Sequence, residues 1–376
     1  MITSLRMARA AALLAAFAIL FNACGAGGSP AAATAATASP VKFTVKQQEL
    51  IDAAKKEGEL VFTSSVLNSK DEQSRLFDGF RKYYGLPDYK ITFTQGPQFP
   101  QMQAKLLEEF AAKKAASTDV FVGTETHYIA LNAANAVDKV DWVGIGGNIN
   151  KASLVAGEGI AVEFVTHVLG IQYNSQKIKN APTSLQDLLK PEYKGLIGTT
   201  AFASGFVTLG SPQLMGPDKA IAYYTQFVKQ LQGQMNCGEE ERTVSGEFPI
   251  FAMDCGGGRI NILKKQGAPI EFVVPSDAAL TNRWYVGIPS NAQHKAAATL
   301  FIDYLLGPDA QKAMWELNGF DNWQLPSSNV AKVIKDYEAK GVKFLHWGIE
   351  SSLADTKAGA KNIRGTLLGI LQSAAK

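Results

Sequence analysis

"QQELIDAAKKEGELVFTSS", residues 47–65, holds the pattern that decides the fold class. Apolar residues recur at helical spacing up to the first glycine, and a short apolar strand that ends in hydroxyl residues follows directly. The same order returns twice, with a helix over 71–85 before a strand over 90–96, and a helix over 99–115 before a strand over 118–124. Helices that alternate with short strands rich in β-branched and aromatic residues predict an α/β fold, with strands covered on both faces.

Small or polar residues stand at the end of each of these three strands. In open α/β sheets, ligands bind outside the carboxyl ends of the strands, so we expect these residues to converge on one edge. The residues are Ser64, Ser65, Gln95, Gly96, Thr124 and Glu125. Each by itself could equally be a helix cap or a turn residue, but three such strand ends in succession favour a binding site.

The N-terminal segment has the composition of an export signal. Two arginines and no acidic residue precede an apolar run, Ala10–Phe21, that is too short to cross a bilayer, so residues 1–23 are interpreted as a signal peptide. We favour cleavage before a lipidated Cys24, although the residues directly before it match the lipoprotein pattern only in part and ordinary cleavage further along is the alternative. Residues 24–41, rich in Gly, Ala, Ser and Thr, would then form a flexible tether.

The three cysteines support this interpretation. If Cys24 is lipidated, Cys237 and Cys255 remain, and in an oxidising compartment we expect them to form a disulfide. Two buried thiols are the alternative. A metal pair is disfavoured, because no other Cys or His lies near them in the sequence.

The charge balance excludes several partners. The chain has 37 Lys and Arg against 34 Asp and Glu, and no basic tract suggests nucleic acid. No later apolar run is long enough for a membrane span, so membrane contact is expected only through the lipid anchor. Roughly 335 residues remain beyond the tether, which is enough for two lobes with separate cores.

Four signatures, in this order, carry a family resemblance. They are "LIDAAKKEGELVFTSS" (50–65), "VLGIQYNSQKIKNAPTSLQDLLKPEYKGLIGTT" (168–200), "SGEFPI" (245–250) and "HKAAATLFIDYLLGPDAQKAMW" (294–315). Together they resemble the substrate-binding proteins of ABC importers, in the group that includes ferric-iron-binding proteins and relatives that take phosphonates, sugar phosphates and other small solutes.

The resemblance implies a bilobal, type II periplasmic-binding-protein fold, in which a hinge closes two α/β lobes over a ligand cleft. Lobe one would comprise 42–126 and 272–318, and lobe two 127–271 and 319–376. The implied partners are a small-molecule solute and a membrane permease. The resemblance further implies that the protein is a monomer without a cofactor or catalytic activity.

The resemblance also places two loops of lobe two at the cleft. Ser204 and Gly205 match a loop where relatives often have Ser-Gly, and the loop within "MDCGGGRINILKKQG" (253–267) contributes further candidates. These candidates are Asp254, Gly256, Gly257 and Arg259. Successive glycines let backbone N–H groups approach an anion, and an arginine adds a planar fork of donors. Alternatively, the glycines only accommodate the disulfide turn, and a nucleotide site is disfavoured because P-loop spacing is absent.

Iron is disfavoured by a departure from the family pattern. Where ferric-binding relatives carry a tyrosine pair, this chain has Gly256 and Gly257, and its own pair, Tyr223 and Tyr224, lies in a helical pattern typical of packing. Glu125, His127 and Asp254 could form a carboxylate and imidazole site. Single residues of these types are more often structural, so we predict no metal.

We therefore predict a high-affinity solute receptor that closes on a small anion, such as a phosphonate, phosphate ester or carboxylate. Ferric iron or an iron chelate, a polyamine, and a periplasmic sensor subunit remain alternatives. An exported hydrolase is less favoured, because neither a G-x-S-x-G nor an H-E-x-x-H motif occurs.

Overall fold

The computed structural model describes residues 42–67 and 69–374. The interpretations of residues 1–23 as a signal peptide, of Cys24 as lipidated and of 24–41 as a tether lie outside the described residues. Among those described, no helix has both the length and the apolar character needed to cross a bilayer.

The elements follow the alternation expected from the sequence. The helices are α1 (Val45–Glu57), α2 (Lys70–Tyr84), α3 (Phe99–Ala111), α4 (Glu125–Ala133), α5 (Ser204–Thr208), α6 (Pro217–Phe227), α7 (Glu241–Ser245), α8 (Gly258–Lys265), α9 (Lys295–Leu305), α10 (Pro308–Asn318), α11 (Asn329–Glu338), α12 (Ile349–Lys357) and α13 (Arg364–Ala374). The strands are β1 (Glu59–Ser64), β2 (Lys90–Gln95), β3 (Phe121–Gly123), β4 (Val155–Ala156), β5 (Ala161–Asn174), β6 (Ile197–Thr199), β7 (Leu231–Gln234), β8 (Ile250–Gly256), β9 (Ile270–Val273), β10 (Leu280–Gly287) and β11 (Leu345–His346).

Local sequence signals explain the first two helices. Thr44 and Ser69 each form a capping box with the residue three positions later, and the helices end at Gly58 and Gly85 in the left-handed conformation. The predicted helices and strands of the N-terminal region are thus confirmed, and the α/β class with them.

The pairing of the third strand differs from expectation. β1 and β2 are parallel, with Ser64 opposite Gln95, but β3 belongs to the second sheet and lies antiparallel to β10. The edge of β3 is therefore occupied by a strand from late in the chain. One backbone hydrogen bond, from the Asp119 N–H to the Val61 carbonyl at 2.8 Å, links the segment before β3 to β1.

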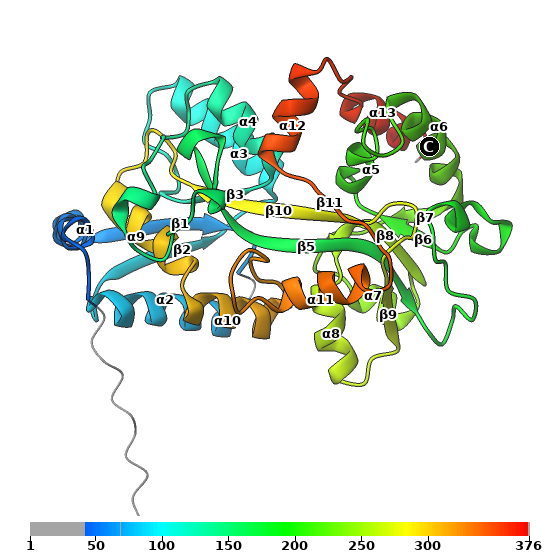
Figure 1. The fold of residues 1–376 in the computed structure, drawn as a ribbon, viewed down its shortest axis with the longest axis horizontal. Coiled ribbons are helices and arrows are strands. Elements are labelled where there is room, and N and C mark those ends of the chain that lie inside the picture. Colours follow the sequence, from blue (N-terminus) through cyan, green and yellow to red (C-terminus); the bar gives the residue numbers. More distant parts are fainter. Residues whose placement is uncertain (1–41, 68, 375–376) are drawn as a thin grey trace, which may run out of the picture. The chain divides into compact units, whose positions relative to one another are not determined.

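The second sheet is organised around β5. Its strand order is β11-β10-β5-β8-β6-β7, with β3, β4 and β9 paired alongside. The first half of β5 pairs with β10 and β4, and its second half pairs with β8 and β9. Figure 1 shows β5 and β10 side by side between two groups of helices, α1, α2 and α9 on one side and α5, α6 and α8 on the other.

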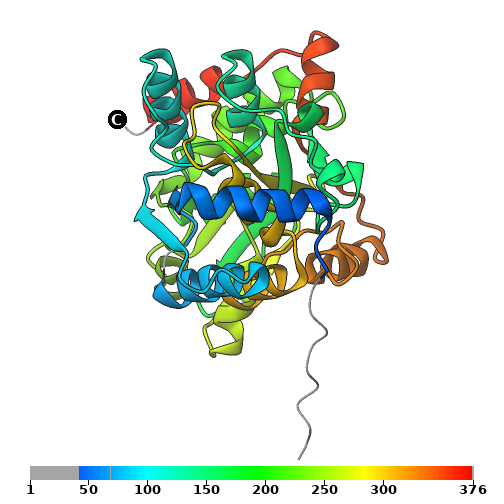
Figure 2. The same cartoon turned by 90° about the vertical axis from the view of Figure 1, so that its left-hand side faces the viewer.

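Each group of helices surrounds its own apolar core, so the fold has two lobes. In lobe one, the ring of Phe301 lies 5.4 Å from that of Phe62 and 5.5 Å from that of Phe80, beneath α1 and α2, which cover the face shown in Figure 2. In lobe two, Tyr223 and Tyr224 are buried on α6, which confirms their packing role. The predicted lobe boundaries remain a prediction.

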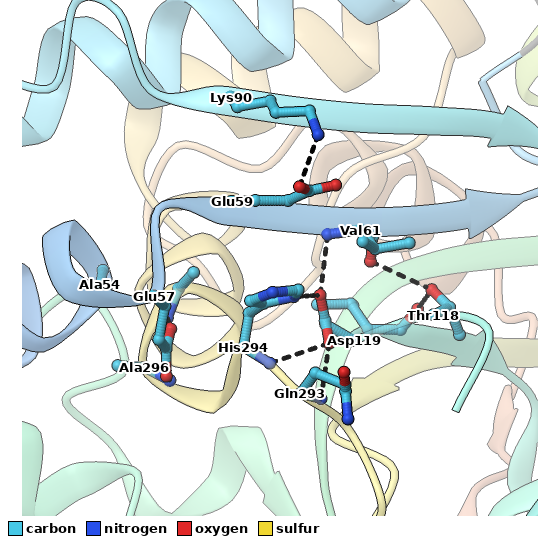
Figure 3. Close-up of polar contacts among 12 residues, drawn as sticks. Ala54, Glu57, Glu59, Val61, Lys90, Thr118, Asp119, Gln293, His294 and Ala296 are labelled. Carbon is cyan, nitrogen blue, oxygen red and sulfur yellow. Dashed lines mark hydrogen bonds and ion pairs between the residues drawn. The ribbon is translucent and has the colours of Figure 1, made fainter. Parts of the chain in front are cut away.

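A buried carboxylate joins distant segments of lobe one. Asp119 accepts hydrogen bonds from the N–H groups of Val61 at 2.7 Å and of Gln293 and His294 at 3.0 Å, and its side chain also contacts the His294 ring at 2.8 Å (Figure 3). Val61 lies on β1, and Gln293 and His294 directly precede α9, so the carboxylate fixes the distance between these two segments. Since Asp119 itself lies just before β3, it also ties β3 to β1.

The C-terminal segment contacts both lobes. Ile349 of α12 packs in a core with residues of α3, α4 and β10, whereas Leu367 and Leu371 of α13 pack in the core of lobe two. Figure 1 shows α12 near α4 and α13 near α6. Residues 358–363 therefore connect a helix that packs against α4 to a helix that packs against α6.

Cys237 and Cys255 form a disulfide, as the cysteine count predicted. Their Cα atoms lie 5.6 Å apart, with a sequence separation of 18 residues. Cys255 is buried near the end of β8, so the bond ties the segment after β7 to the loop that precedes α8.

Replacing both cysteines by serine should lower the free energy of unfolding by about 3 kcal/mol, because the unfolded chain regains the entropy of an open loop. Urea unfolding of the oxidised protein and the double variant measures this difference. Reduced wild-type protein is the matched control and should resemble the variant. Equal unfolding midpoints in all three samples would contradict the prediction.

Candidate functional site

The residues predicted at the first two strand ends lie together. Ser64 is opposite Gln95 in the parallel pair, and the N–H of Gly96 donates to the Ser64 carbonyl at 3.1 Å. The Ser64 hydroxyl accepts from the Val66 N–H at 3.2 Å, so it also stabilises the turn after β1. Ser65 is partly exposed in this turn.

Thr124 and Glu125 begin α4. The Thr124 N–H donates to Nδ1 of His127 at 3.0 Å, which fixes the first turn of the helix. Glu125 is only 8% exposed. Burial raises the pKa of its carboxyl group, because removal from water disfavours the charged form.

Two residues of the C-terminal segment lower the pKa of this carboxyl group and so oppose the effect of burial. The Trp347 side chain donates a hydrogen bond to the carboxyl group, and the positive charge of Arg364, at the start of α13, opposes the effect of burial on the Glu125 pKa. Oε2 of Glu125 and Nε of Arg364 are buried without a hydrogen-bond partner, and no ion pair joins these two side chains in the described part of the chain. We call Glu125, Arg364, Trp347, Thr124 and His127 the Glu125–Arg364 site.

An aromatic cluster extends from this site to the strands between the lobes. The Phe99 ring lies 6.0 Å from that of His127 and 5.2 Å from that of Trp284 on β10. His167 on β5 follows, 4.2 Å from the Trp284 ring and 4.6 Å from the Phe320 ring. The cluster therefore links the start of α4 to the centre of β5.

Both histidines of this region are neutral at physiological pH. Burial lowers the pKa of His127 to about 4, with a further lowering by the charge of Arg364, and burial lowers the pKa of His167 to about 3. Nε2 of His167 is buried and has no hydrogen-bond partner among the described residues.

The two predicted loops of lobe two lie against each other. A Cβ on Gly205 would collide with the backbone carbonyl of Met253, so only glycine permits this approach. Ala203 and Met253 have φ angles of 51° and 70°, a left-handed conformation that costs about 1–3 kcal/mol in non-glycine residues. Such strain is concentrated at functional sites, and here it directly precedes Ser204 and Asp254.

The glycine loop makes mainly internal contacts. A Cβ on Gly256 would lie 2.7 Å from Nδ1 of His167, and one on Gly257 would lie 2.8 Å from the Phe272 ring. The Gly257 N–H donates to the carbonyl of Val168 at 3.1 Å. The prediction that this loop contacts a solute stays a prediction, but the glycines are also required by their neighbours.

Arg259 has acidic partners within the same lobe. Its guanidinium forms ion pairs with Glu240, at 3.3 Å, and with Glu241. A solute anion at Arg259 would have to share the guanidinium with these carboxylates.

Within residues 42–67 and 69–374, no group of three His, Cys, Asp or Glu residues is arranged to hold a metal ion.

Sequence reasoning missed Arg364, Trp347, His167 and Trp284. His167 lies on β5 and Trp284 on β10, in segments whose sequence is typical of ordinary strands, and Arg364 and Trp347 belong to a C-terminal segment without a motif. A polar residue such as His167 inside the long apolar run of β5 is the one signal that could have indicated a site.

Comparison with known proteins identifies the family to which the chain is similar. The family model of bacterial extracellular solute-binding proteins matches residues 76–341. The spermidine/putrescine-binding periplasmic protein of Escherichia coli is 28% identical over 158 residues, which are 40% of this chain and 43% of that protein. The chain thus spans less than half the length of this curated relative.

Solved structures show the same fold at low sequence identity. The substrate-binding protein of an ABC transporter from Agrobacterium tumefaciens has a TM-score of 0.67 at 13% identity, covering 85% of this chain and 94% of that one. The periplasmic binding protein AfuA from Actinobacillus pleuropneumoniae, with fructose-6-phosphate bound, has a TM-score of 0.64 at 20% identity, covering 83% and 97%. The bilobal architecture is common to these proteins.

The low pKa of His167 predicts a pH dependence of stability. An unfolded histidine gains a proton below about pH 6.5 but folded His167 does not until about pH 3, so the stability it contributes is present above pH 6.5 and is lost as the pH falls. His167→Gln should therefore reduce the slope of unfolding free energy against pH by up to about 1.4 kcal/mol per pH unit between pH 6 and 4.

Urea unfolding at several pH values measures this slope. Phe320→Leu is the matched control, because it weakens the same ring contact without removing a titrating group. It should lower stability at every pH and leave the slope unchanged. Parallel slopes for wild type and His167→Gln would show that the folded imidazole is protonated normally.

Proposed function

The chain belongs to the bacterial extracellular solute-binding proteins, and we propose on that premise that it is the solute receptor of an ABC importer. Family and structural neighbours are binding proteins that work with a membrane permease. The receptor would act as a monomer without catalysis, closing on a small solute and delivering it to its permease.

One observation carries the proposed location of the solute. Glu125 begins α4, which packs with α3 and α12, and Arg364 begins α13, which packs with α6; each buries a side-chain polar atom without a partner among the described residues. Buried polar groups in folded proteins are almost always paired, so an unpaired set between two lobes is suited to a ligand. Relative motion of the lobes about β5 and β10 would open and close this site.

We propose that the solute carries an anionic group, such as a carboxylate, a phosphate ester or a phosphonate. Arg364 supports this, because its guanidinium is adapted to planar or tetrahedral oxyanions and has no acidic partner in contact within the described chain. The predicted loops at 64–65, 95–96, 204–205 and 254–259 are proposed as further walls of the cleft.

A polyamine is the second candidate. The buried carboxylate of Glu125 is suited to an ammonium group, and the matched Escherichia coli relative is named for spermidine and putrescine. Arg364 argues against a solute that carries only positive charges, because it would lie beside them.

A thermal-shift screen of the purified protein tests the proposal. The panel comprises carboxylates, phosphate esters, phosphonates, polyamines and ferric citrate. A true solute at one hundred times its Kd should stabilise the protein by about 2.7 kcal/mol and be recovered unchanged. Loss of uptake of the same compound in cells that lack the protein would distinguish an importer component from a sensor subunit.

Glu49→Gln, an exposed change on α1, is the control variant and should bind as wild type does. Conversion of the stabilising compound to a product would identify an enzyme instead. A panel without any stabilising compound would leave the receptor proposal without support.

We also propose a periplasmic location with a lipid anchor on Cys24. The location is supported by the periplasmic relatives, and the anchor by the apolar run before this cysteine. Cys24→Ala should move the protein from the detergent phase to the aqueous phase in detergent partitioning. Wild-type protein with an N-terminus beyond Cys24 would contradict the anchor.

A further inference from the structure

A cavity of about 240 Å³ lies beside β5, where α8, α10 and α11 meet. Its walls come from these three helices and from β9, and Thr166, His167 and Val168 of β5, all buried, form its inner end. Figure 1 shows α8, α10 and α11 below β5, and α4, α12 and α13 above it. Among the described residues that line the cavity, none belongs to the predicted ends of β1, β2 and β3 or to the Glu125–Arg364 site. The cavity is therefore distinct from that site and adjoins the proposed cleft at the glycine loop.

The glycine loop is needed to form this cavity. Gly257 and Gly258 line it together with Gly319, which ends α10. A Cβ on Gly258 would collide with the backbone carbonyl of Gly319, and one on Gly257 would lie 2.8 Å from the Phe272 ring. Larger residues here would push α8 away from α10 or displace the Phe272 ring. The glycines therefore allow α8 and α10 to approach each other closely enough to enclose the cavity.

The walls are mainly apolar and aromatic. Three partly exposed aromatic side chains line the cavity, namely Trp315 of α10, Phe272 of β9 and Tyr337 of α11. Val330 and Val333 precede Tyr337 at helical spacing, so they lie on the same face of α11. An engineered cavity of about 150 Å³ with apolar walls accepts benzene, so this larger one accommodates a single ring with a small substituent. Aromatic walls favour an aromatic ring, because edge and stacking contacts between rings are attractive.

The mouth of the cavity has no net charge. Lys264 of α8 and Glu271 of β9 both line it and form an ion pair at 2.5 Å, so each charge already has a partner. Asn261, one turn before Lys264 on α8, adds an amide group that both donates and accepts hydrogen bonds. His167 at the inner end is neutral, because burial lowers its pKa to about 3. An ion in this cavity would lose its hydration without gaining an opposite charge of its own, which is unfavourable.

We propose that the cavity binds an uncharged single-ring aromatic molecule with one hydrogen-bonding group, such as a phenol or an aryl alcohol. The ring would contact Trp315, Phe272 and Tyr337, and its polar group would face Asn261 at the mouth. A bound ring would contact α8 and α10 at once and so hold these helices together. The inference goes beyond the proposed receptor function and does not depend on it.

Ligand-observed NMR titrations of the purified wild-type protein with matched probes test the proposal. Benzyl alcohol and phenol are the expected ligands. Cyclohexylmethanol has a similar shape without an aromatic ring, and benzoate and benzylamine carry the ring with a negative or a positive charge. Benzyl alcohol should bind about three- to tenfold more tightly than cyclohexylmethanol, because the contacts between rings are lost, and about tenfold or more tightly than either ion.

Three variants assign the site. Val333→Phe places a ring in the cavity and should abolish the binding of benzyl alcohol. Trp315→Leu should weaken binding about threefold or more, whereas Trp315→Phe keeps an aromatic wall and should bind nearly as wild type does. Val45→Phe, the same type of change at an exposed position of α1, is the control and should leave binding unchanged. Circular dichroism verifies that each variant is folded.

Each outcome decides the proposal. Preferential binding of benzyl alcohol to wild type, together with its loss in Val333→Phe, supports it. If cyclohexylmethanol, benzoate or benzylamine binds as tightly as benzyl alcohol, the ligand class is wrong. If neither Val333→Phe nor Trp315→Leu weakens binding, or if neither benzyl alcohol nor phenol binds wild type, the cavity is not such a site. The comparison among probes needs only wild-type protein, so a variant that fails to fold does not prevent a decision.

Discussion

Backbone pairing along both edges of β5 is the constraint on which the two-lobed structure depends. This strand spans 14 residues, from Ala161 to Asn174, and its two halves have different partners, β10 and β4 for the first and β8 and β9 for the second. Each lobe is thus anchored to the same continuous strand. A slip of one residue would turn every side chain to the opposite face, so the partners hold the register tightly.

The same strand supplies polar groups to both of its faces. Glu163 is buried, lies 3.3 Å from Arg283 and accepts a hydrogen bond from the Thr166 hydroxyl at 2.8 Å, while His167 turns to the aromatic rings on the other face. The first set ties the strand to the C-terminal segment, since Gln324 also donates to Glu163 at 2.6 Å. Buried polar groups satisfied in this way specify one arrangement of the strands.

The C-terminal segment, which contacts β5, also contains residues of the proposed binding site. α12 packs with α4, and α13, which begins at Arg364, packs with α6, so the C-terminal segment places a positive charge where it lowers the pKa of the Glu125 carboxyl group. In the proposed function, closure of the lobes would bring these opposite charges to one solute. A solute that bridges them would therefore stabilise one orientation, which is the physical basis of closure by differential affinity.

The glycine loop illustrates how one pattern serves two requirements. Gly258 and Gly319 approach so closely that a Cβ on either would meet the backbone of the other, and Gly256 leaves room for His167. The local sequence does not show whether a glycine leaves room for a ligand or for a neighbouring segment of the chain. Arg259 shows the same ambiguity, since its partners Glu240 and Glu241 are close in space but 18 or more residues away in the sequence.

The sequence by itself determined the α/β class, the helices and strands of the N-terminal region, the disulfide between Cys237 and Cys255 and the resemblance to solute-binding proteins. These depend on periodicity, capping residues, cysteine count and motifs, which are local or countable. Only the tertiary structure decided that β3 pairs with β10 and that the charge of Arg364 acts on the carboxyl group of Glu125, 239 positions earlier in the numbering. Such contacts arise from the packing of whole elements against one another, and no spacing within either segment encodes them.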